Sequence, residues 1–212
     1  MTTETTGSYK CPLCNKLSRH KIIMSTNEFG SCDLDTRPAE MRRSTMHTWV
    51  QECPHCGYAA SKLTDTPEVD AAFLQTPEYL SYGGIAFGSE LAKKFYRLYL
   101  IKRHAKDARN AYFSALEAAW ASDDAKDDES AVACRNLAIE PLEEWIEEEP
   151  ENEHLKLMKF DVLRRARRFD EMLQYAEEVA FEDAFLRGIA NFAVELAKKQ
   201  DAACYTVADV PE

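Results

Sequence analysis

Two pairs of cysteines with the same spacing carry the strongest chemical signal in the sequence. Cys11 and Cys14 form one Cys-x-x-Cys pair, Cys53 and Cys56 form another, and 38 residues lie between the two pairs. Thiolates are soft ligands, and four of them are a typical tetrahedral set for zinc. A Cys-x-x-Cys pair can instead exchange electrons as a thiol and disulfide couple. The first question is therefore whether these cysteines bind a metal or do redox chemistry.

The residues around each pair favour the metal. A proline follows the first cysteine of each pair, and the residue after the second cysteine is Asn15 in one pair and Gly57 in the other. In a metal knuckle, proline fixes one backbone dihedral, and the residue after the second cysteine needs a positive φ. Glycine adopts that conformation most easily and asparagine next. We therefore predict that the four cysteines hold one zinc ion, with iron as a less favoured alternative.

The sequence Cys-Pro-His-Cys at 53–56 keeps a redox alternative open. Strongly oxidising thiol oxidoreductases use such a pair, with the first cysteine at a helix N-terminus, where the helix dipole lowers its pKa, inside a βαβ framework. Here Gly57 follows the pair directly, no βαβ pattern surrounds it, and a second pair is present. Metal binding is therefore the preferred hypothesis, and a thiol oxidoreductase remains an alternative.

The segment that must position the cysteines is poor in apolar residues. It contains only short β-prone runs, at 21–24 and 46–51, which is too little material for an independent core. Metal binding would supply much of its folding free energy, on the order of 10 kcal/mol. We predict a small zinc-ribbon module of short antiparallel strands over residues 10–65, preceded by a disordered tail at 1–9.

From about residue 85 the apolar residues recur with a period of 3.6, which predicts amphipathic helices. Six such stripes joined by short turns indicate stacked antiparallel hairpins, at 91–99, 108–119, 134–146, 155–166, 169–179 and 185–196. Thr66 and Pro67 resemble a helix start, and Pro141 is expected to kink or split its helix. The fold class is thus mainly α, with a helical domain at 66–200 and a C-terminal tail at 201–212.

One of these hairpins has the pattern of a tetratricopeptide-type unit. The stretch "RRFDEMLQYAEEVA" at 167–180 places an aromatic residue at a tight turn and then small and apolar residues at helical spacing. That spacing lets two helices approach closely. We predict a degenerate array of tetratricopeptide-like hairpins.

Charge and hydropathy limit the classes of partner. The net charge is −11, but residues 1–65 hold 8 Lys and Arg against 7 Asp and Glu, so the remainder carries 18 against 30. A strongly acidic surface repels phosphate, which leaves only the first part as a candidate for nucleic acid. No apolar run approaches the roughly 18 residues of a membrane span, and the N-terminus lacks the features of a signal peptide. We expect a cytoplasmic protein without a membrane partner.

A stretch between the cysteine pairs, residues 30–45, concentrates charges of both signs. They are Asp33, Asp35, Arg37, Arg42 and Arg43. One hypothesis is a loop held together by Asx turns and local ion pairs. The other is a ligand-binding loop in which the arginines contact an anionic or peptide ligand. Both hypotheses stay open at the level of sequence.

The motifs "CPLCNK" and "WVQECPHCGYAA", followed by helices with "LRRARRF" at 163–169, resemble a bacterial family, domain of unknown function 2225. The resemblance implies an N-terminal zinc-ribbon module joined to tetratricopeptide-like helices, with Cys11, Cys14, Cys53 and Cys56 as the family's cysteines. It implies no activity. The sequence departs from the family pattern at Asn15, where glycine is usual, and between the pairs, where a tyrosine-rich run is expected.

These observations favour a zinc-binding, non-enzymatic scaffold or adaptor that binds a protein or peptide through its helical domain. A first alternative is a nucleic-acid-associated zinc-ribbon protein that uses the basic residues of the N-terminal module. An enzyme is a further alternative, either the thiol oxidoreductase or a hydrolase that uses Asp33, Asp35 and His47.

Overall fold

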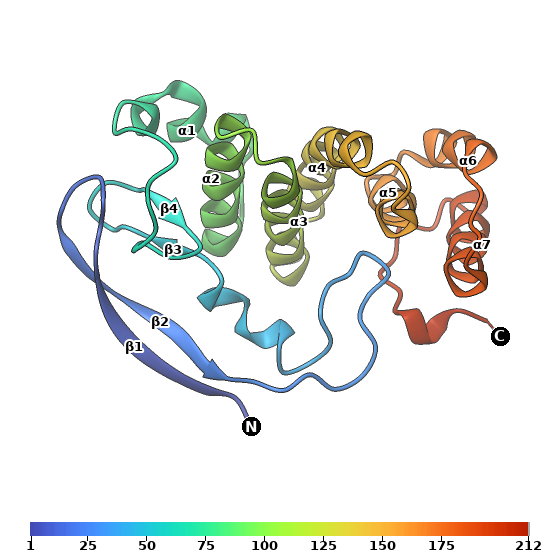
Figure 1. Cartoon of the computed structure of the whole chain (residues 1–212), viewed down its shortest axis with the longest axis horizontal. Helices are drawn as coiled ribbons and strands as arrows, with labels where there is room; N and C mark the ends of the chain where they lie inside the picture. The colour runs from blue at the N-terminus through green and yellow to red at the C-terminus, as the bar shows by residue number, and fades with distance from the viewer. Residues whose placement is uncertain (212) are drawn as a thin grey trace.

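In the computed structural model, which describes residues 1–211, a mainly helical body follows a long N-terminal β-hairpin (Figure 1). Strand β1 (Thr3–Lys10) pairs antiparallel with β2 (Leu17–Ser25). A second, much shorter hairpin consists of β3 (Gln51–Glu52) and β4 (Ala59–Ala60). Each hairpin carries one Cys-x-x-Cys pair at its turn, so the short antiparallel strands predicted for this region are confirmed.

The prediction that residues 1–9 are disordered is wrong for Thr3 onward. These residues form β1 in register with β2, with Gly7 opposite His20 and Tyr9 opposite Ser18. The sequence of β1 shows no alternation of apolar and polar residues, and most of its side chains are exposed. The strand forms because its backbone pairs with β2, and not because one of its faces is apolar. Pairing with a distant strand is a tertiary property that the pattern of β1 alone does not show.

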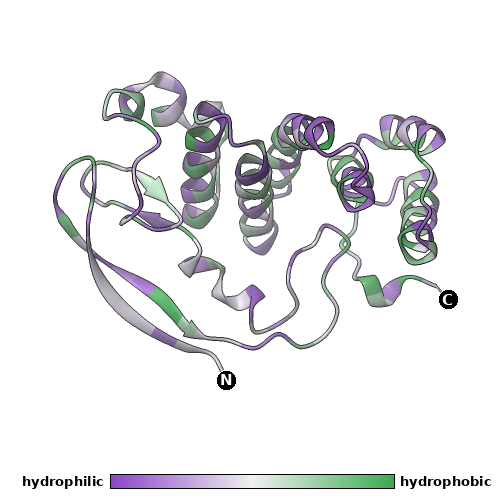
Figure 2. Ribbon diagram, in the orientation of Figure 1, coloured by the Kyte–Doolittle hydropathy of each residue, from purple (hydrophilic) through white to green (hydrophobic). Residues whose placement is uncertain are grey.

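The helical part contains seven α-helices among the described residues. The six predicted amphipathic helices are confirmed as α2 to α7, and a short helix α1 precedes them. Their bounds are α1 (Pro77–Ser81), α2 (Glu90–His104), α3 (Ala108–Asp124), α4 (Asp128–Glu148), α5 (Glu153–Arg165), α6 (Phe169–Glu178) and α7 (Ala184–Lys198). On the ribbon, hydrophobic and hydrophilic residues alternate around α2 and α3, as amphipathic packing requires (Figure 2).

Four of the helices end with one backbone geometry. Lys106, Lys126, Arg167 and Gln200 each adopt a left-handed conformation, with φ between 54° and 62°. In each turn the next residue donates its N–H to a carbonyl five positions earlier, as Asp127 does to Ser122 (2.9 Å). This is the Schellman arrangement, here without glycine. The chain therefore reverses direction by one repeated turn, while the tetratricopeptide-like class stays a prediction.

Two details of the helix prediction need comment: the start at Thr66 is wrong, and of the kink or split expected at Pro141 the split does not occur. The helix start predicted at Thr66 and Pro67 occurs ten residues later, where Thr76 caps α1 and Pro77 is its first residue. The earlier stretch is non-helical, and Glu68 is held there by Lys102 of α2 (2.6 Å). Pro141 lies inside α4 without splitting it. Pro141 is buried, and α4 continues through it although proline donates no backbone hydrogen bond.

One hydrophobic core connects the two parts of the chain. Cys11, Cys53 and Leu63 from the N-terminal part belong to the same buried cluster as Phe95 of α2 and the helices that follow. The domain boundaries at 65 and 200 remain predictions. Among the described residues, no helix has the length and apolarity needed to cross a membrane.

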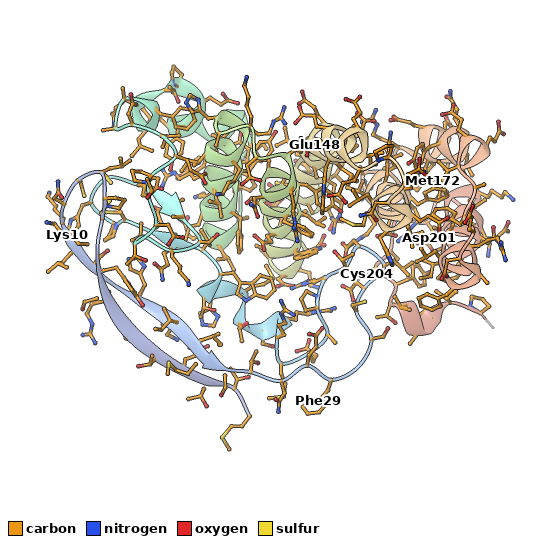
Figure 3. The ribbon with its side chains drawn as sticks, in the orientation of Figure 1. Lys10, Phe29, Glu148, Met172, Asp201 and Cys204 are labelled. Atoms are coloured by element: carbon orange, nitrogen blue, oxygen red, sulfur yellow. The ribbon has the colours of Figure 1, made fainter. Side chains whose placement is uncertain are left out.

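The stretch 30–45 extends beneath the helices and meets the C-terminal segment, near Cys204 (Figures 1 and 3). Leu34 donates its N–H to the carbonyl of Tyr205, and Val207 donates to that of Cys32, both at 2.9 Å. The C-terminal tail is therefore anchored to the loop between the cysteine pairs.

Candidate metal centre and buried ion cluster

The two cysteine knuckles have matching backbone geometry. Asn15 donates its N–H to the carbonyl of Cys11 (2.9 Å), and Gly57 donates to the carbonyl of Cys53 (2.8 Å). Both donors have positive φ, 61° for Asn15 and 78° for Gly57. The conformational requirement deduced from the sequence is thus met at both positions, and each knuckle directs its two sulfurs to the same side.

The four sulfurs come together in one cluster. Each Sγ lies within 4.8 Å of the other three, and the Cys11–Cys56 and Cys14–Cys53 pairs are both 3.6 Å apart. A tetrahedron with zinc–sulfur bonds of about 2.3 Å has edges of about 3.8 Å, so the arrangement fits one zinc ion. The separations are far too long for a disulfide, whose sulfurs lie about 2.0 Å apart. Cys11, Cys14, Cys53 and Cys56 are thus positioned to bind one metal ion.

The environment of the thiols also calls for a cation. The backbone N–H of Lys16 lowers the pKa of Cys14 to about 7, whereas burial raises the pKa of Cys53 and of Cys56. Four thiolates in so small a space repel one another. A divalent ion removes that repulsion and would stabilise the deprotonated form of all four.

The second knuckle is fastened to the helical part. The hydroxyl of Tyr79 in α1 donates to the carbonyl of Gly57 (2.8 Å), and Arg97 of α2 forms an ion pair with Glu52 (2.8 Å). The guanidinium of Arg97 also lies over the ring of Tyr82, 4.8 Å from its centroid. The metal centre is therefore coupled to α1 and α2 by contacts that do not involve the metal.

Asp35, from the stretch 30–45, lies at the centre of a buried ion cluster. Its carboxylate accepts hydrogen bonds from Trp120 Nε1 (2.8 Å) and from Arg165 Nη1 (2.6 Å). Arg135 lies 3.6 Å from Asp35 and also binds Asp123 (3.1 Å), which in turn accepts from Arg165 (2.9 Å). Asp35 and Arg135 are at most 2% exposed. The cluster joins the loop to α3, α4 and α5.

Three of the other charged residues of the loop also have internal partners. Asp33 is buried and binds Arg43 within the loop, and Cys204 donates to it (3.2 Å). Arg37 is buried and reaches Asp124 of α3 (2.6 Å). Arg42 is exposed, and its nearest partner is Glu28, at 3.5 Å. The local ion pairs expected from the sequence are present, and the longer-range ones to the helices are additional.

The sequence model of a bacterial family, described as an uncharacterized protein conserved in bacteria and as domain of unknown function 2225, matches residues 5–163. The chain belongs to this family. No curated protein and no solved structure matches the chain. The matched region contains both knuckles and the helices up to most of α5, so all four cysteines of the candidate metal centre lie within it.

Residues important for the ion cluster escaped the sequence prediction. Arg135 and Arg165 belong to helices whose stripes were defined only by their apolar members, and both arginines are buried. Arg164 is fully buried as well and donates to the carbonyls of Asp201 (2.7 Å) and Ala203 (2.9 Å). The available signal was the pair Arg164 and Arg165, two and three positions beyond Val162 in the apolar stripe of α5.

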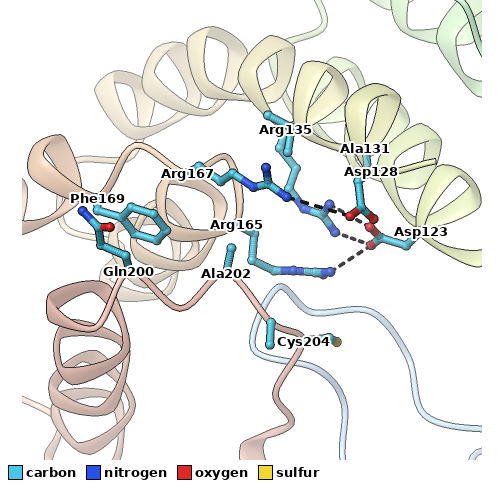
Figure 4. A pocket seen from close by; sticks show the side chains of 12 residues that line it. Asp123, Asp128, Ala131, Arg135, Arg165, Arg167, Phe169, Gln200, Ala202 and Cys204 are labelled. Atoms are coloured by element: carbon cyan, nitrogen blue, oxygen red, sulfur yellow. Dashed lines mark hydrogen bonds and ion pairs between the residues drawn. The ribbon is translucent and has the colours of Figure 1, made fainter. Parts of the chain in front are cut away.

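A polar cavity of about 580 Å³ opens beside the cluster, between α4, the turn from α5 to α6, and the C-terminal segment (Figure 4). Arg135, Arg165 and Arg167 line it together with Asp123 and Asp128. The Nε atoms of Arg135 and Arg165 are buried and have no hydrogen-bond partner among the described residues. Arg167 is largely exposed, and its guanidinium lies 3.9 Å from the carboxylate of Asp128. The exposed guanidinium of Arg167 is therefore the donor group that this cavity presents to a ligand, with Asp123 and Asp128 as nearby acceptors.

Proposed function

We propose that this family member is a zinc-stapled, non-enzymatic scaffold that binds a protein or peptide through its helical part. The polar cavity beside the ion cluster carries this proposal. It combines the exposed guanidinium of Arg167 with the nearby carboxylates of Asp123 and Asp128, which suits a chain bearing both carbonyl acceptors and N–H donors. Its volume of about 580 Å³ lies within the roughly 300–1,000 Å³ range of ligand pockets.

The metal centre has a structural role in this proposal. Four protein thiolates fill the four positions that zinc prefers, which leaves none open for a substrate or a water molecule. The ion would hold the hairpin tips β1–β2 and β3–β4 together and thereby fix both ends of the intervening loop. That loop supplies Asp35 to the cluster that forms one side of the cavity.

The test is affinity purification of the zinc-loaded chain with identification of partners by mass spectrometry, combined with one variant in the cavity. Arg167→Glu reverses a charge at the cavity without altering a buried contact. Lys106→Glu is the matched control, because Lys106 has the same left-handed conformation at the end of α2 and is equally a basic residue at a helix turn. Neither residue lines the metal centre.

We expect partners that are recovered with the wild type and with Lys106→Glu, and lost with Arg167→Glu. A set of recovered proteins that is the same for all three chains contradicts binding at this cavity. The direct complex is then measured with the purified partner, because charge reversal at the site should weaken it about tenfold or more.

The alternatives have weaker support. A nucleic-acid surface would need the basic residues of the N-terminal part, but Arg37 and Arg43 are already bound to carboxylates. A thiol oxidoreductase would place Cys53 at a helix N-terminus, whereas Cys53 follows β3 and shares its cluster with three other thiols. A hydrolase would need His47 beside Asp33 or Asp35, and His47 instead lies 3.0 Å from Glu4.

A further inference from the structure

A second cavity, of about 340 Å³, lies between the loop and α3. Three of its residues belong to one face of α3, because Phe113, Glu117 and Trp120 are four and then three positions apart. The remainder are Thr36, Pro38 and Arg42 from the stretch 30–45, and Trp49, which directly follows a short 3-10 helix at Arg43–Thr48. The cavity therefore combines three aromatic rings with one carboxyl group.

Glu117 has no hydrogen-bond or ion partner among the described residues. Burial raises its pKa to about 8, and no neighbouring charge offsets that effect. The other charged residue lining the cavity is Arg42, which is mostly exposed and whose guanidinium lies beside Glu28 (3.5 Å). A half-buried carboxyl group thus faces a cavity without the positive partner that its burial calls for.

The chemistry around Glu117 is that of an ammonium site. Aromatic rings attract cations through their negative faces, and a carboxylate adds a full opposite charge. Trp49 and Phe113 are half-buried, so they can contact a ligand that enters the cavity. Residues beyond 65 hold 30 acidic against 18 basic residues, so the long-range field also favours a positive ligand.

We propose that this cavity takes up a lysine side chain of the bound protein or peptide, an inference that rests on the proposed function for the source of the lysine. The ammonium group lies beside the Glu117 carboxylate, and the methylene stem packs against the rings of Trp49 and Phe113. The site is separate from the polar cavity. Trp120 connects the two, because it lines this cavity and donates to Asp35 of the ion cluster.

Binding of the cation requires the ionised form of Glu117, so affinity increases as the pH rises from about 6 to about 8. Arg42, the other charged group that lines the cavity, is paired with Glu28 (3.5 Å). The pH dependence therefore belongs to Glu117, and Glu117→Gln removes it.

The experiment uses two small probes and the zinc-loaded full chain. N-acetyl-lysine amide is titrated while tryptophan fluorescence and calorimetric heat are recorded, and N-acetyl-norleucine amide, which has the same four side-chain carbons without the ammonium group, serves as the uncharged probe. The variants are Glu117→Gln, which keeps the shape of the side chain, and Phe113→Leu, which removes a ring. Glu177→Gln, at an exposed position of α6, is the matched control for loss of one negative charge.

We expect saturable binding of the lysine probe and about tenfold weaker binding of the norleucine probe. The affinity for the lysine probe should fall by the same factor of about ten in Glu117→Gln and in Phe113→Leu. Glu177→Gln should bind as the wild type does. No saturable response up to about 50 mM, or equal responses to both probes, overturns the proposal.

These outcomes are independent of the partner experiment. Lysine binding without any partner that depends on Arg167 would remove the proposed function at the polar cavity and leave the ammonium site in place. A partner that depends on Arg167 but is bound equally by Glu117→Gln and by wild type would support the proposed function and remove the ammonium site.

Discussion

The loop between the cysteine pairs is held at two places by two kinds of cluster. At its ends, Cys11 and Cys56 bring their sulfurs together across 45 residues, and in its middle Asp35 reaches Arg165 across 130. The metal centre uses four side chains of one type, each presented by a turn adapted to it. The ion cluster uses single charged residues contributed by the loop and three helices.

The comparison shows two ways to stabilise a segment that has little core of its own. Metal binding adds a large favourable free energy that depends on the metal. In a buried ion cluster, the cost of desolvation cancels much of the attraction, so its importance appears when one partner is removed. Burial by itself would raise the pKa of Asp35, but Arg165, Arg135 and the indole of Trp120 together lower it.

The largest expected effect comes from breaking the metal centre with Cys53→Ser. We expect loss of the ion and of most of the metal-linked free energy, on the order of 10 kcal/mol, so that the region from 10 to 64 unfolds. Elemental analysis should find about one zinc per wild-type chain, and limited proteolysis should cut the variant within this region. Cys32→Ser, on the same loop, is the control and should keep its zinc. If Cys53→Ser keeps its zinc as Cys32→Ser does, the four-cysteine site is contradicted.

Asp35→Ala should cost about 3–5 kcal/mol, because it leaves Arg135 and Arg165 buried with less compensation. Urea denaturation of the zinc-loaded protein measures this, with the exposed Glu40→Ala as the control on the same loop. Because the pKa of Asp35 is lowered in the folded state, its contribution is present above about pH 4 and is lost as the pH falls through the lowered value. An effect of Asp35→Ala no larger than that of Glu40→Ala would falsify the central role of the cluster.

Glu117 should show the opposite pH dependence, because its pKa is raised to about 8 rather than lowered. Its stabilising contribution is present below the unfolded pKa of about 4.3 and is lost as the pH rises through about 8. The wild type should lose about 2 kcal/mol relative to Glu117→Gln over this range, since partial exposure reduces the full linkage value. Thermal unfolding at several pH values measures the difference. Parallel profiles for the two proteins contradict the raised pKa.

Tyr79→Phe removes the one hydrogen bond that joins α1 to the second knuckle at Gly57. The expected cost is about 1 kcal/mol, because the ring stays in place and a single neutral hydrogen bond is lost. Chemical denaturation measures the stability, and the zinc content should be unchanged. A loss of zinc in this variant would show that α1 supports the metal centre directly.

The smallest effect is expected for Asn15→Gly, which makes the first knuckle resemble the second. The φ of 61° at Asn15 favours glycine, so we expect a gain of about 0.5 kcal/mol or less in the zinc-loaded state. Competition with a zinc chelator compares the variant with the wild type. A marked loss of zinc would mean that the Asn15 side chain has a role of its own.

Much of the helical part was predictable because its signal is local. The period of 3.6 located α2 to α7, since each helix must bury one face whatever its neighbours are. The start of α1 was misplaced because Thr-Pro-Glu occurs at both 66 and 76, and the ion pair of Glu68 in the first copy with Lys102 of α2 is a tertiary contact that the local pattern does not show. Strand β1 was missed because its partner, not its composition, defines it.

The sequence by itself determined the four-cysteine cluster, because ligand type, spacing and the backbone needs of Asn15 and Gly57 are all properties of short segments. Only the tertiary structure decided what the charged loop does. Asp35, Arg135 and Arg165 are far apart in the chain, and no local sequence pattern links them. A charged side chain has no preferred partner until folding removes it from water. Burial of these three side chains makes their ion pairs necessary. Burial also places Glu117 beside an aromatic cavity, where it has no ion partner among the described residues.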